Sequence, residues 1–319
     1  MEGKGMKKFI ITIDTEGDNL WDWKPGSPIT TENASYLQRF QDLAEKYGFK
    51  PVWLANYEML QNERFIDFIN KIESNKCGEL GMHLHAWNTP PLYDLPVESN
   101  GAPYLIEYPE DYIEYKVKTM TELIKEKTGV LPVSHRAGRW AMNETYFRVL
   151  NKYGYRVDCS VTPHIDWSNS CGQTLNSKGS DYSFSPDTPH YVCGVLEIPV
   201  SVLPAHKVFL PDEKSPRRIL GSVYHAIKGQ NLWLRPNGKN LSQMLWLLKR
   251  YEAIDADYIM FMLHSSEMMP GGSPTFQNKD SIEQMYSDCE ELFKTAHHTF
   301  EGITLRDYAP IAGGKCEQN

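Results

Sequence analysis

Short apolar segments rich in β-branched residues alternate with longer amphipathic segments along most of this 319-residue chain. Strands joined by helices run parallel in one sheet, and the helices then cover its faces. The strand-like segments are residues 7–14, 50–56, 78–87, 130–138, 156–161, 195–202 and 257–264, with 301–308 as a candidate for the last strand. The helix-like segments are 31–49, 62–75, 109–129, 143–155, 240–254 and 278–298. This alternation of strand-like and helix-like segments predicts an α/β fold.

The number of strands favours a barrel over an open, doubly wound sheet. Seven or eight parallel strands suit a (β/α) barrel. No G-x-G-x-x-G follows the first strand, as a dinucleotide-binding sheet would require. Residues 1–319 are expected to form a single domain without a linker. Two long loops, 88–108 and 162–194, interrupt the alternation of strands and helices, and loops of this length are often functional.

Composition narrows the classes of partner. The net charge is −8, and no block of Lys and Arg stands out, so nucleic acid and anionic membranes are poor candidates. No run of 18 apolar residues occurs, which argues against a membrane span. The start, MEGKGMKKFI, lacks the features of a signal peptide, and the six cysteines form no C-x-x-C. We therefore expect a cytoplasmic protein with reduced cysteines.

Polar residues recur where the predicted strands end. The active site of a parallel α/β barrel is built from the carboxyl ends of its strands. Five segments contribute titratable side chains there: Asp14 and Glu16, His83 and His85, His135 and Arg136, Asp158, and His264. Such a set at the carboxyl ends of the strands, here called the rim of the barrel, predicts an active site.

The spacing within two of these pairs indicates a metal. Side chains at positions i and i+2 of a strand point to the same face, so Asp14 and Glu16 face together, as do His83 and His85. Two imidazoles and a carboxylate from a neighbouring strand suit Zn²⁺ or a similar divalent ion and leave a position open for water. We expect a divalent metal, with zinc first and cobalt, manganese, nickel or iron as alternatives.

Each residue taken alone also has a structural explanation. Asp14 and Glu16 could belong to a turn and a helix cap, and Arg136 could be part of a structural ion pair. Asp158 could be a hydrogen-bond acceptor at a strand end, and His264 a satisfied core histidine. The functional interpretation rests on the joint pattern.

In this order the residues resemble the NodB-homology polysaccharide deacetylases (carbohydrate esterase family 4). The resemblance covers about residues 7–270, through ITIDTEG at 11–17, HLH at 83–85, RAG at 136–138, Asp158 and LH at 263–264. It implies a distorted (β/α) barrel that hydrolyses amide C–N bonds with metal assistance. The catalytic residues that it implies are Asp14 as the base, Arg136 orienting that base, His264 as the general acid, and Asp158 in the fourth motif.

The resemblance also implies Glu16 and His83 as metal ligands, and His85 is inferred as a third. The chain departs from the family pattern at IDTEG, which replaces FDDG, so Asp14 stays an alternative acidic ligand. The histidines are two residues apart instead of four, and RAGRW lacks the proline of the third motif. These departures place the chain on a divergent branch.

Tryptophans just beyond the strand ends suit a sugar substrate, because flat amphipathic rings pack against the apolar faces of pyranoses. Trp21, Trp87 and Trp140 are the candidate substrate-binding residues, although each could instead pack a loop onto the barrel. The expected activity is N-deacetylation of an amino-sugar-containing glycan or precursor. The alternatives are a cyclic-amide or ureide hydrolase, a saccharide-binding barrel without turnover and, more weakly, a two-carboxylate glycosidase. The sequence leaves the oligomeric state open.

Overall fold

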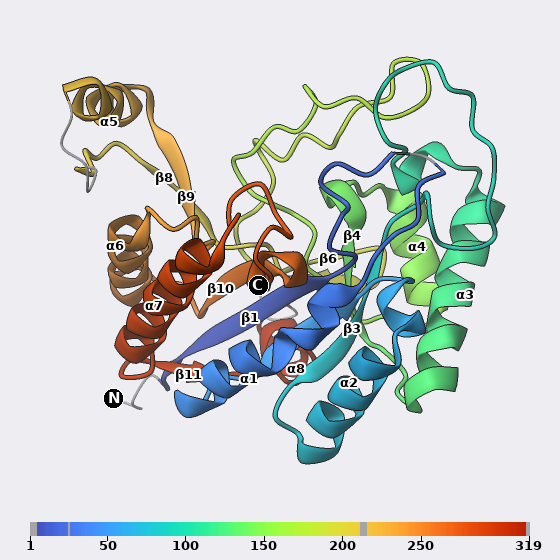
Figure 1. Ribbon diagram of the computed structural model, residues 1–319, viewed down its shortest axis with the longest axis horizontal. Helices are drawn as coiled ribbons and strands as arrows, with labels where there is room; N and C mark the ends of the chain where they lie inside the picture. Colours follow the sequence, from blue (N-terminus) through green and yellow to red (C-terminus); the bar gives the residue numbers. More distant parts are fainter. Residues whose placement is uncertain (1–4, 25, 211–215, 317–319) are drawn as a thin grey trace.

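A curled sheet of eight parallel strands, with a ninth antiparallel strand at one edge, forms the centre of the molecule (Figure 1). The computed structural model describes residues 5–24, 26–210 and 216–316. The strands lie in the order β10 (Tyr258–His264), β1 (Lys7–Thr15), β2 (Pro51–Ala55), β3 (Glu79–Leu84), β4 (Ser134–Ala137), β5 (Val157–Asp158), β7 (Val195–Glu197) and β6 (His190–Val192), and β11 (Phe300–Gly302) pairs with the start of β1. The predicted distorted (β/α) barrel is confirmed.

Side-chain alternation along the strands separates two apolar cores. In β1 the residues Phe9, Ile11 and Ile13 pack towards the surrounding helices, while Ile10 faces the inside of the curled sheet. The outer core is covered by α1 (Leu37–Lys46), α2 (Glu63–Asn75), α3 (Glu110–Thr128), α4 (Glu144–Lys152), α6 (Leu241–Ala253) and α7 (Lys279–Ala296). Both faces of the sheet are therefore buried, as parallel strands require.

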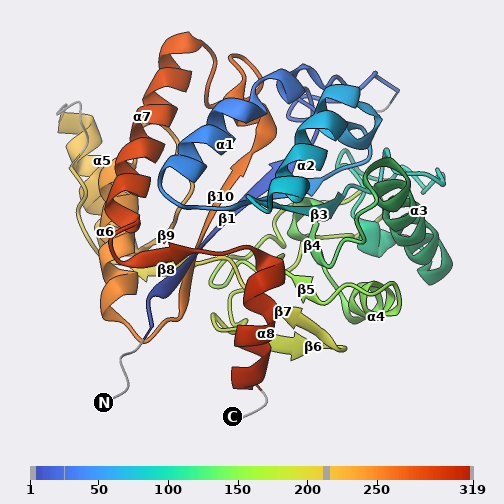
Figure 2. The same cartoon turned by 90° about the horizontal axis from the view of Figure 1, so that it is seen from below.

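The inside of the curled sheet is closed at the end where the strands begin. Helix α8 (Leu305–Cys316) packs Leu305, Tyr308 and Ala312 into this inner core (Figure 2). The segment after β7 also returns to β10, because the Met260 backbone N–H donates a 2.9 Å hydrogen bond to Ser201 Oγ. Access to the inside is left at the opposite end, where the strands finish.

The segment after β7 differs from the prediction. Residues 195–202 were expected as one strand, but β7 ends at Glu197 and a separate hairpin follows, formed by β8 (Val202–Ala205) and β9 (Gln230–Trp233). Helix α5 (Pro216–Lys228) lies between these two strands. The expected strand at 301–308 is also divided, into the short β11 and the start of α8. Val195 and Leu196 belong to the barrel, whereas Leu203 pairs with Leu232 of the hairpin.

The two long loops lie against each other at the carboxyl end of the strands. The backbone N–H groups of Glu98 and Ser99 donate to the carbonyl oxygen of Gln173, at 3.0 and 3.1 Å. Arg139 reaches between the loops, because its guanidinium donates to the carbonyl oxygens of Ala102 and Cys171. The loops thus wall one side of this end. In the described ranges, no helix is both long enough and apolar enough to cross a bilayer.

Candidate metal centre

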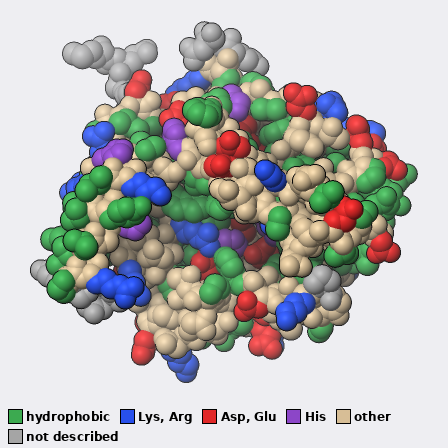
Figure 3. All heavy atoms as spheres, turned by 90° about the horizontal axis from the view of Figure 1, so that it is seen from above, with side chains coloured by type: hydrophobic (Ala, Val, Ile, Leu, Met, Phe, Trp, Pro, Cys, Tyr) green, Lys and Arg blue, Asp and Glu red, His purple; other side chains and the backbone are tan. Residues whose placement is uncertain are grey.

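Four strands bring their last polar side chains together at the open end of the barrel. Asp14 of β1 lies opposite His264 of β10, and His83 of β3 lies opposite Arg136 of β4. The residues of this end lie at the floor of a hollow, where Figure 3 shows basic, acidic and histidine side chains. The predicted rim thus exists, and it gathers most of the residues expected there.

Glu16, His83 and His85 converge on one point. Glu16 Oε2 lies 2.8 Å from His85 Nε2 and 3.3 Å from His83 Nε2, and the two Nε2 atoms are 3.1 Å apart. Ligand atoms of a tetrahedral zinc, at about 2.0–2.1 Å from the ion, lie about 3.3 Å from one another. The three atoms therefore fit a divalent cation with small adjustments. Within the described residues, this is the one group of three His, Cys, Asp or Glu side chains so arranged.

The tautomer of His83 is set by its second nitrogen. His83 Nδ1 lies 2.9 Å from the carbonyl oxygen of Arg136 and donates its proton there, which leaves Nε2 with a lone pair towards the cluster. His85 is held by close packing, because a Cβ at Gly138 would come within 2.6 Å of His85 Nδ1. Residue 138 must therefore be glycine for this ring position, which explains the glycine of RAG.

The charge states of the cluster follow from burial and from the neighbours. Burial raises the pKa of Glu16, but hydrogen bonds from His83 and His85 outweigh it and hold that pKa well below its ordinary value. Burial lowers the pKa of His85. For His83, burial also acts to lower the pKa, but the carboxylates of Asp14 and Glu16 raise it overall. An ionised carboxylate beside two imidazoles is a donor set that suits zinc.

Asp14 is paired with Arg136 inside the barrel. Arg136 Nη1 donates to Asp14 Oδ1 at 2.7 Å, and both side chains are buried. Burial alone would raise the pKa of Asp14, but the Arg136 guanidinium and then His83 lower it below its ordinary value. Arg136 is itself fixed by the carbonyl oxygen of Cys159 and by Thr12 Oγ1. Asp14 is therefore ionised and held in one orientation. It lies beside the group formed by Glu16, His83 and His85 but is not part of it.

His264 lies close to the carboxylates of both Asp14 and Glu16. Its Nε2 is 3.8 Å from Asp14 Oδ2 and 3.9 Å from Glu16 Oε1. Its Nδ1 is 3.0 Å from Glu267 Oε2, and Arg235 Nη2 lies 3.3 Å from Glu267 Oε1. Arg235 Nη2 also lies 3.2 Å from His264 Nδ1, so Nδ1 faces Glu267 and Arg235 while Nε2 is directed towards Asp14.

The three predicted tryptophans each lie against a different site residue. The Trp21 ring is 5.0 Å from the His264 ring, and the Trp87 ring is 4.1 Å from the His85 ring, between centroids. Trp140 lies over the Arg136 guanidinium at 5.0 Å. Trp21 is 40% exposed, so part of this side chain can be reached by a ligand.

Asp158 does not join this group, contrary to its predicted place among the catalytic residues. Its neighbours Val157 and Cys159 face the inner core, so the alternation along β5 turns Asp158 to the opposite face of the sheet. There it bonds to His135 Nδ1 at 2.6 Å and to Ser160. His135 also faces outwards, and its Nε2 contacts Tyr146 of α4.

Several residues around the site were missed by reading the sequence. Arg235 and Trp233 come from the unexpected hairpin, and Glu267 follows β10 in SSEMM. Glu58 accepts the Gly17 N–H at 2.7 Å, and burial raises its pKa to about 7. Of these, Glu267 alone had a local signal, because a carboxylate three residues after His264 can reach back to it.

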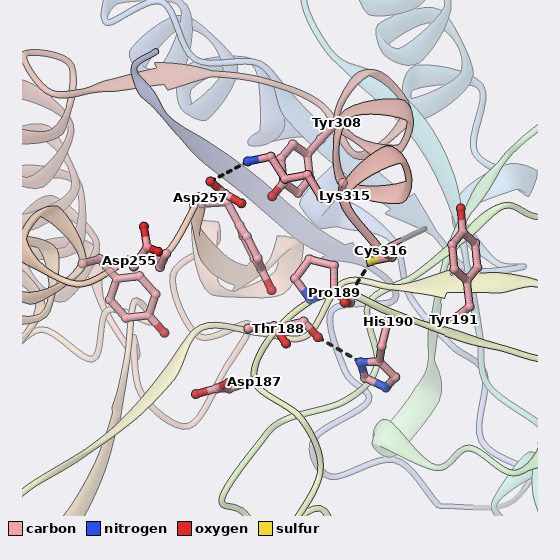
Figure 4. Close-up of a pocket in the computed structure, with 14 residues that line it drawn as sticks. Asp187, Thr188, Pro189, His190, Tyr191, Asp255, Asp257, Tyr308, Lys315 and Cys316 are labelled. Carbon is pink, nitrogen blue, oxygen red and sulfur yellow. Dashed lines mark hydrogen bonds and ion pairs between the residues drawn. The ribbon is translucent and has the colours of Figure 1, made fainter. Parts of the chain in front are cut away.

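A separate pocket of about 500 Å³ lies at the closed end of the barrel. Figure 4 shows its lining, from the loop before β6, the start of β10 and helix α8, with Lys315 paired to Asp257 at 2.7 Å. It contains none of the predicted site residues. This pocket is therefore distinct from the candidate metal centre.

Comparison with solved structures matches this fold over nearly the whole chain. A protein assigned as a polysaccharide deacetylase, from Mycobacterium smegmatis, superposes with a TM-score of 0.57 at 14% identity, covering 99% of this chain and 93% of that one. A protein assigned as a glycoside hydrolase or deacetylase, from Parabacteroides distasonis, gives 0.59 at 13% identity, covering 98% and 72%. A 4-α-glucanotransferase from Thermococcus litoralis gives 0.56 at 10% identity, covering 96% and 40%.

No protein-family model matches the sequence, and no curated protein matches it either. At these identities the structural matches establish the fold alone, and the glucanotransferase has the same fold with a different named activity. The chain therefore has the distorted (β/α) barrel fold of structures assigned as polysaccharide deacetylases.

Proposed function

We propose that this protein is a metal-dependent hydrolase of amide C–N bonds that removes the acetyl group from an amino sugar in a glycan or glycan precursor. One observation carries the proposal: Glu16 and the two histidines offer three ligand atoms within 3.3 Å of one another, beside a buried Asp14–Arg136 pair and opposite His264. The fold shared with proteins assigned as deacetylases supports it.

Glu16, His83 and His85 would hold the ion. A divalent cation held there would polarise the scissile carbonyl and make water more acidic, and zinc is the first candidate. Asp14 is ionised, so it can take the proton of the attacking water. Arg136 holds Asp14 Oδ1 and leaves Oδ2 facing the site.

His264 would protonate the leaving amine. An amine departs poorly as an anion, so the reaction requires an acid on the side of the carbonyl opposite the base. His264 Nε2 faces Asp14 Oδ2 across 3.8 Å, and Glu267 Oε2, 3.0 Å from Nδ1, holds the ring in this orientation. Trp21, next to His264, provides an exposed ring against which a pyranose can pack.

The test is release of acetate. The zinc-loaded protein is incubated with a panel of N-acetylated sugar nucleotides and short N-acetylhexosamine oligosaccharides, and free acetate is assayed against an Asp14→Asn control. Acetate from at least one substrate, lost in the control, is the expected result. Hydrolysis of a ureide or a cyclic amide, with no acetate from any member of the panel, would replace the proposed substrate class with the alternative one.

A further inference from the structure

Helix α5 stands clear of the barrel and exposes most of its apolar face. Leu220, Tyr224 and Ile227 are 73%, 58% and 76% exposed, and Val223 between them is 37% exposed. These positions repeat at the spacing of one helix face. Figure 1 shows α5 at the upper left, beyond the end of the sheet at which the strands finish. A helix normally buries such a face, so its exposure marks an interaction surface.

The segment that carries this face has a basic sequence in an otherwise acidic protein. Residues 203–239 contain seven Lys and Arg against two Asp and Glu, whereas the whole chain carries a net charge of −8. Helix α5 itself, PRRILGSVYHAIK, contains no acidic residue, and Arg217 and Lys228 are exposed at its two ends. The hairpin that carries α5 is anchored to the barrel, since Phe209 packs on Trp246 of α6 with ring centroids 5.7 Å apart.

We propose that α5 docks the protein on an anionic membrane surface, with Leu220, Tyr224 and Ile227 entering the interface and Arg217 and Lys228 contacting lipid phosphates. An apolar stripe flanked by basic residues is the pattern of helices that lie in the plane of a membrane. The overall acidity of the chain does not prevent this, because charges more than about 8 Å away are screened at physiological ionic strength.

Charge argues against a second copy of this chain as the occupant. An antiparallel pair of α5 helices would bring Arg217 of one copy towards Lys228 of the other, and a parallel pair would bring each residue towards its own equivalent. Both arrangements set like charges together, and α5 offers no carboxylate to relieve them. An anionic lipid surface satisfies the basic ends and the apolar stripe at once.

The test is sedimentation with vesicles, using the full chain without added substrate. The protein should sediment with vesicles of phosphatidylcholine containing phosphatidylglycerol, and not with phosphatidylcholine alone. The Leu220→Ser/Ile227→Ser variant should bind at least about tenfold more weakly. Arg217→Gln/Lys228→Gln should weaken binding about fivefold for each charge removed, and added salt should reduce binding by the wild type.

The matched control is Leu131→Ser/Leu175→Ser, which changes two leucines that are 60% and 66% exposed elsewhere on the molecule. Its binding should equal that of the wild type, and circular dichroism should show native helix content in every variant. Absence of binding to anionic vesicles at low salt would overturn the proposal, as would equal binding by Leu220→Ser/Ile227→Ser. A dimer in analytical ultracentrifugation that dissociates on this substitution, without vesicle binding, would instead assign α5 to self-association. None of these outcomes depends on the proposed deacetylation.

Discussion

Asp14 and Arg136 form a 2.7 Å ion pair in the interior of the barrel, where both side chains are almost completely inaccessible to water. The pair joins β1 to β4 across the intervening β2 and β3. Removing one member leaves the other charge buried without compensation, which is far more costly than losing an ion pair on the surface.

Replacing Arg136 with Met should therefore lower the free energy of unfolding by about 3–5 kcal/mol at neutral pH. The loss should shrink as the pH falls. In the wild type, the pKa of Asp14 lies below its ordinary value of 3.8, so the pair stabilises the fold above that range and is lost only on strong acidification. Without Arg136, burial should raise the pKa of Asp14, so the variant regains stability as this carboxyl takes up a proton.

Urea denaturation of the wild type and Arg136→Met between pH 7 and pH 4 measures this difference. Arg148→Met, at an exposed position with only long contacts to carboxylates, is the matched control and should show a small, constant difference. A gap between the wild type and Arg136→Met that stays constant or widens towards low pH would contradict the pairing.

His264→Asn should lower kcat by about 10²-fold or more while leaving the metal content unchanged, because the proposed role of the imidazole is to give a proton and not to bind the ion. His298→Asn, at an exposed histidine, should have no effect on kcat. Full activity of His264→Asn on a competent substrate would remove the role of general acid.

Trp21→Ala should raise KM for a sugar substrate by about three- to tenfold with a smaller change in kcat, since loss of one stacking face corresponds to about 0.5–1.5 kcal/mol. The Trp21 indole N–H also donates to Ser266 Oγ at 3.1 Å. Trp21→Phe loses this hydrogen bond but keeps an aromatic ring, and it should therefore recover most of the affinity. Steady-state kinetics on the two variants separates stacking from positioning. Equal KM values for the wild type and Trp21→Ala would exclude Trp21 from the substrate site.

Asp158→Asn should reduce stability and spare catalysis. Asp158 accepts hydrogen bonds from His135 and Ser160 on the outer face of the sheet, so losing the charge should cost about 1–3 kcal/mol of unfolding free energy. The kcat of the folded variant should match that of the wild type. A variant with native stability and a large loss of kcat would return Asp158 to the catalytic residues.

The difference between Asp158 and the other rim residues shows what the sequence could reveal. The parallel barrel and its rim follow from the alternation of strands and helices, and the same-face pairing of His83 and His85 follows from the two-residue period of a strand. The direction in which Asp158 points depends on the same period, but β5 has only two residues, and its phase relative to the barrel is set by Val157 and Cys159. A strand of two residues is too short for the sequence pattern to show which side chain faces the inside of the barrel.

The β8–β9 hairpin and helix α5 could not be predicted from the alternation of strands and helices. Its strands pair with each other, although Leu234, just beyond β9, also bridges to Phe261 of β10. The segment therefore interrupts the alternation that revealed the rest. Arg235 reaches His264 because of this tertiary contact, which no local pattern encodes.

Metal content tests the central claim most directly. The purified wild type, loaded with zinc and dialysed, should contain about one zinc per chain by elemental analysis, because Glu16, His83 and His85 are the three proposed protein ligands of one open zinc site. His83→Ala/His85→Ala should contain none, and His206→Ala/His298→Ala, at two exposed histidines, should retain the wild-type amount. A wild type that retains no divalent metal, or a His83→Ala/His85→Ala variant that retains as much as the wild type, would contradict the assignment of this cluster as a metal centre.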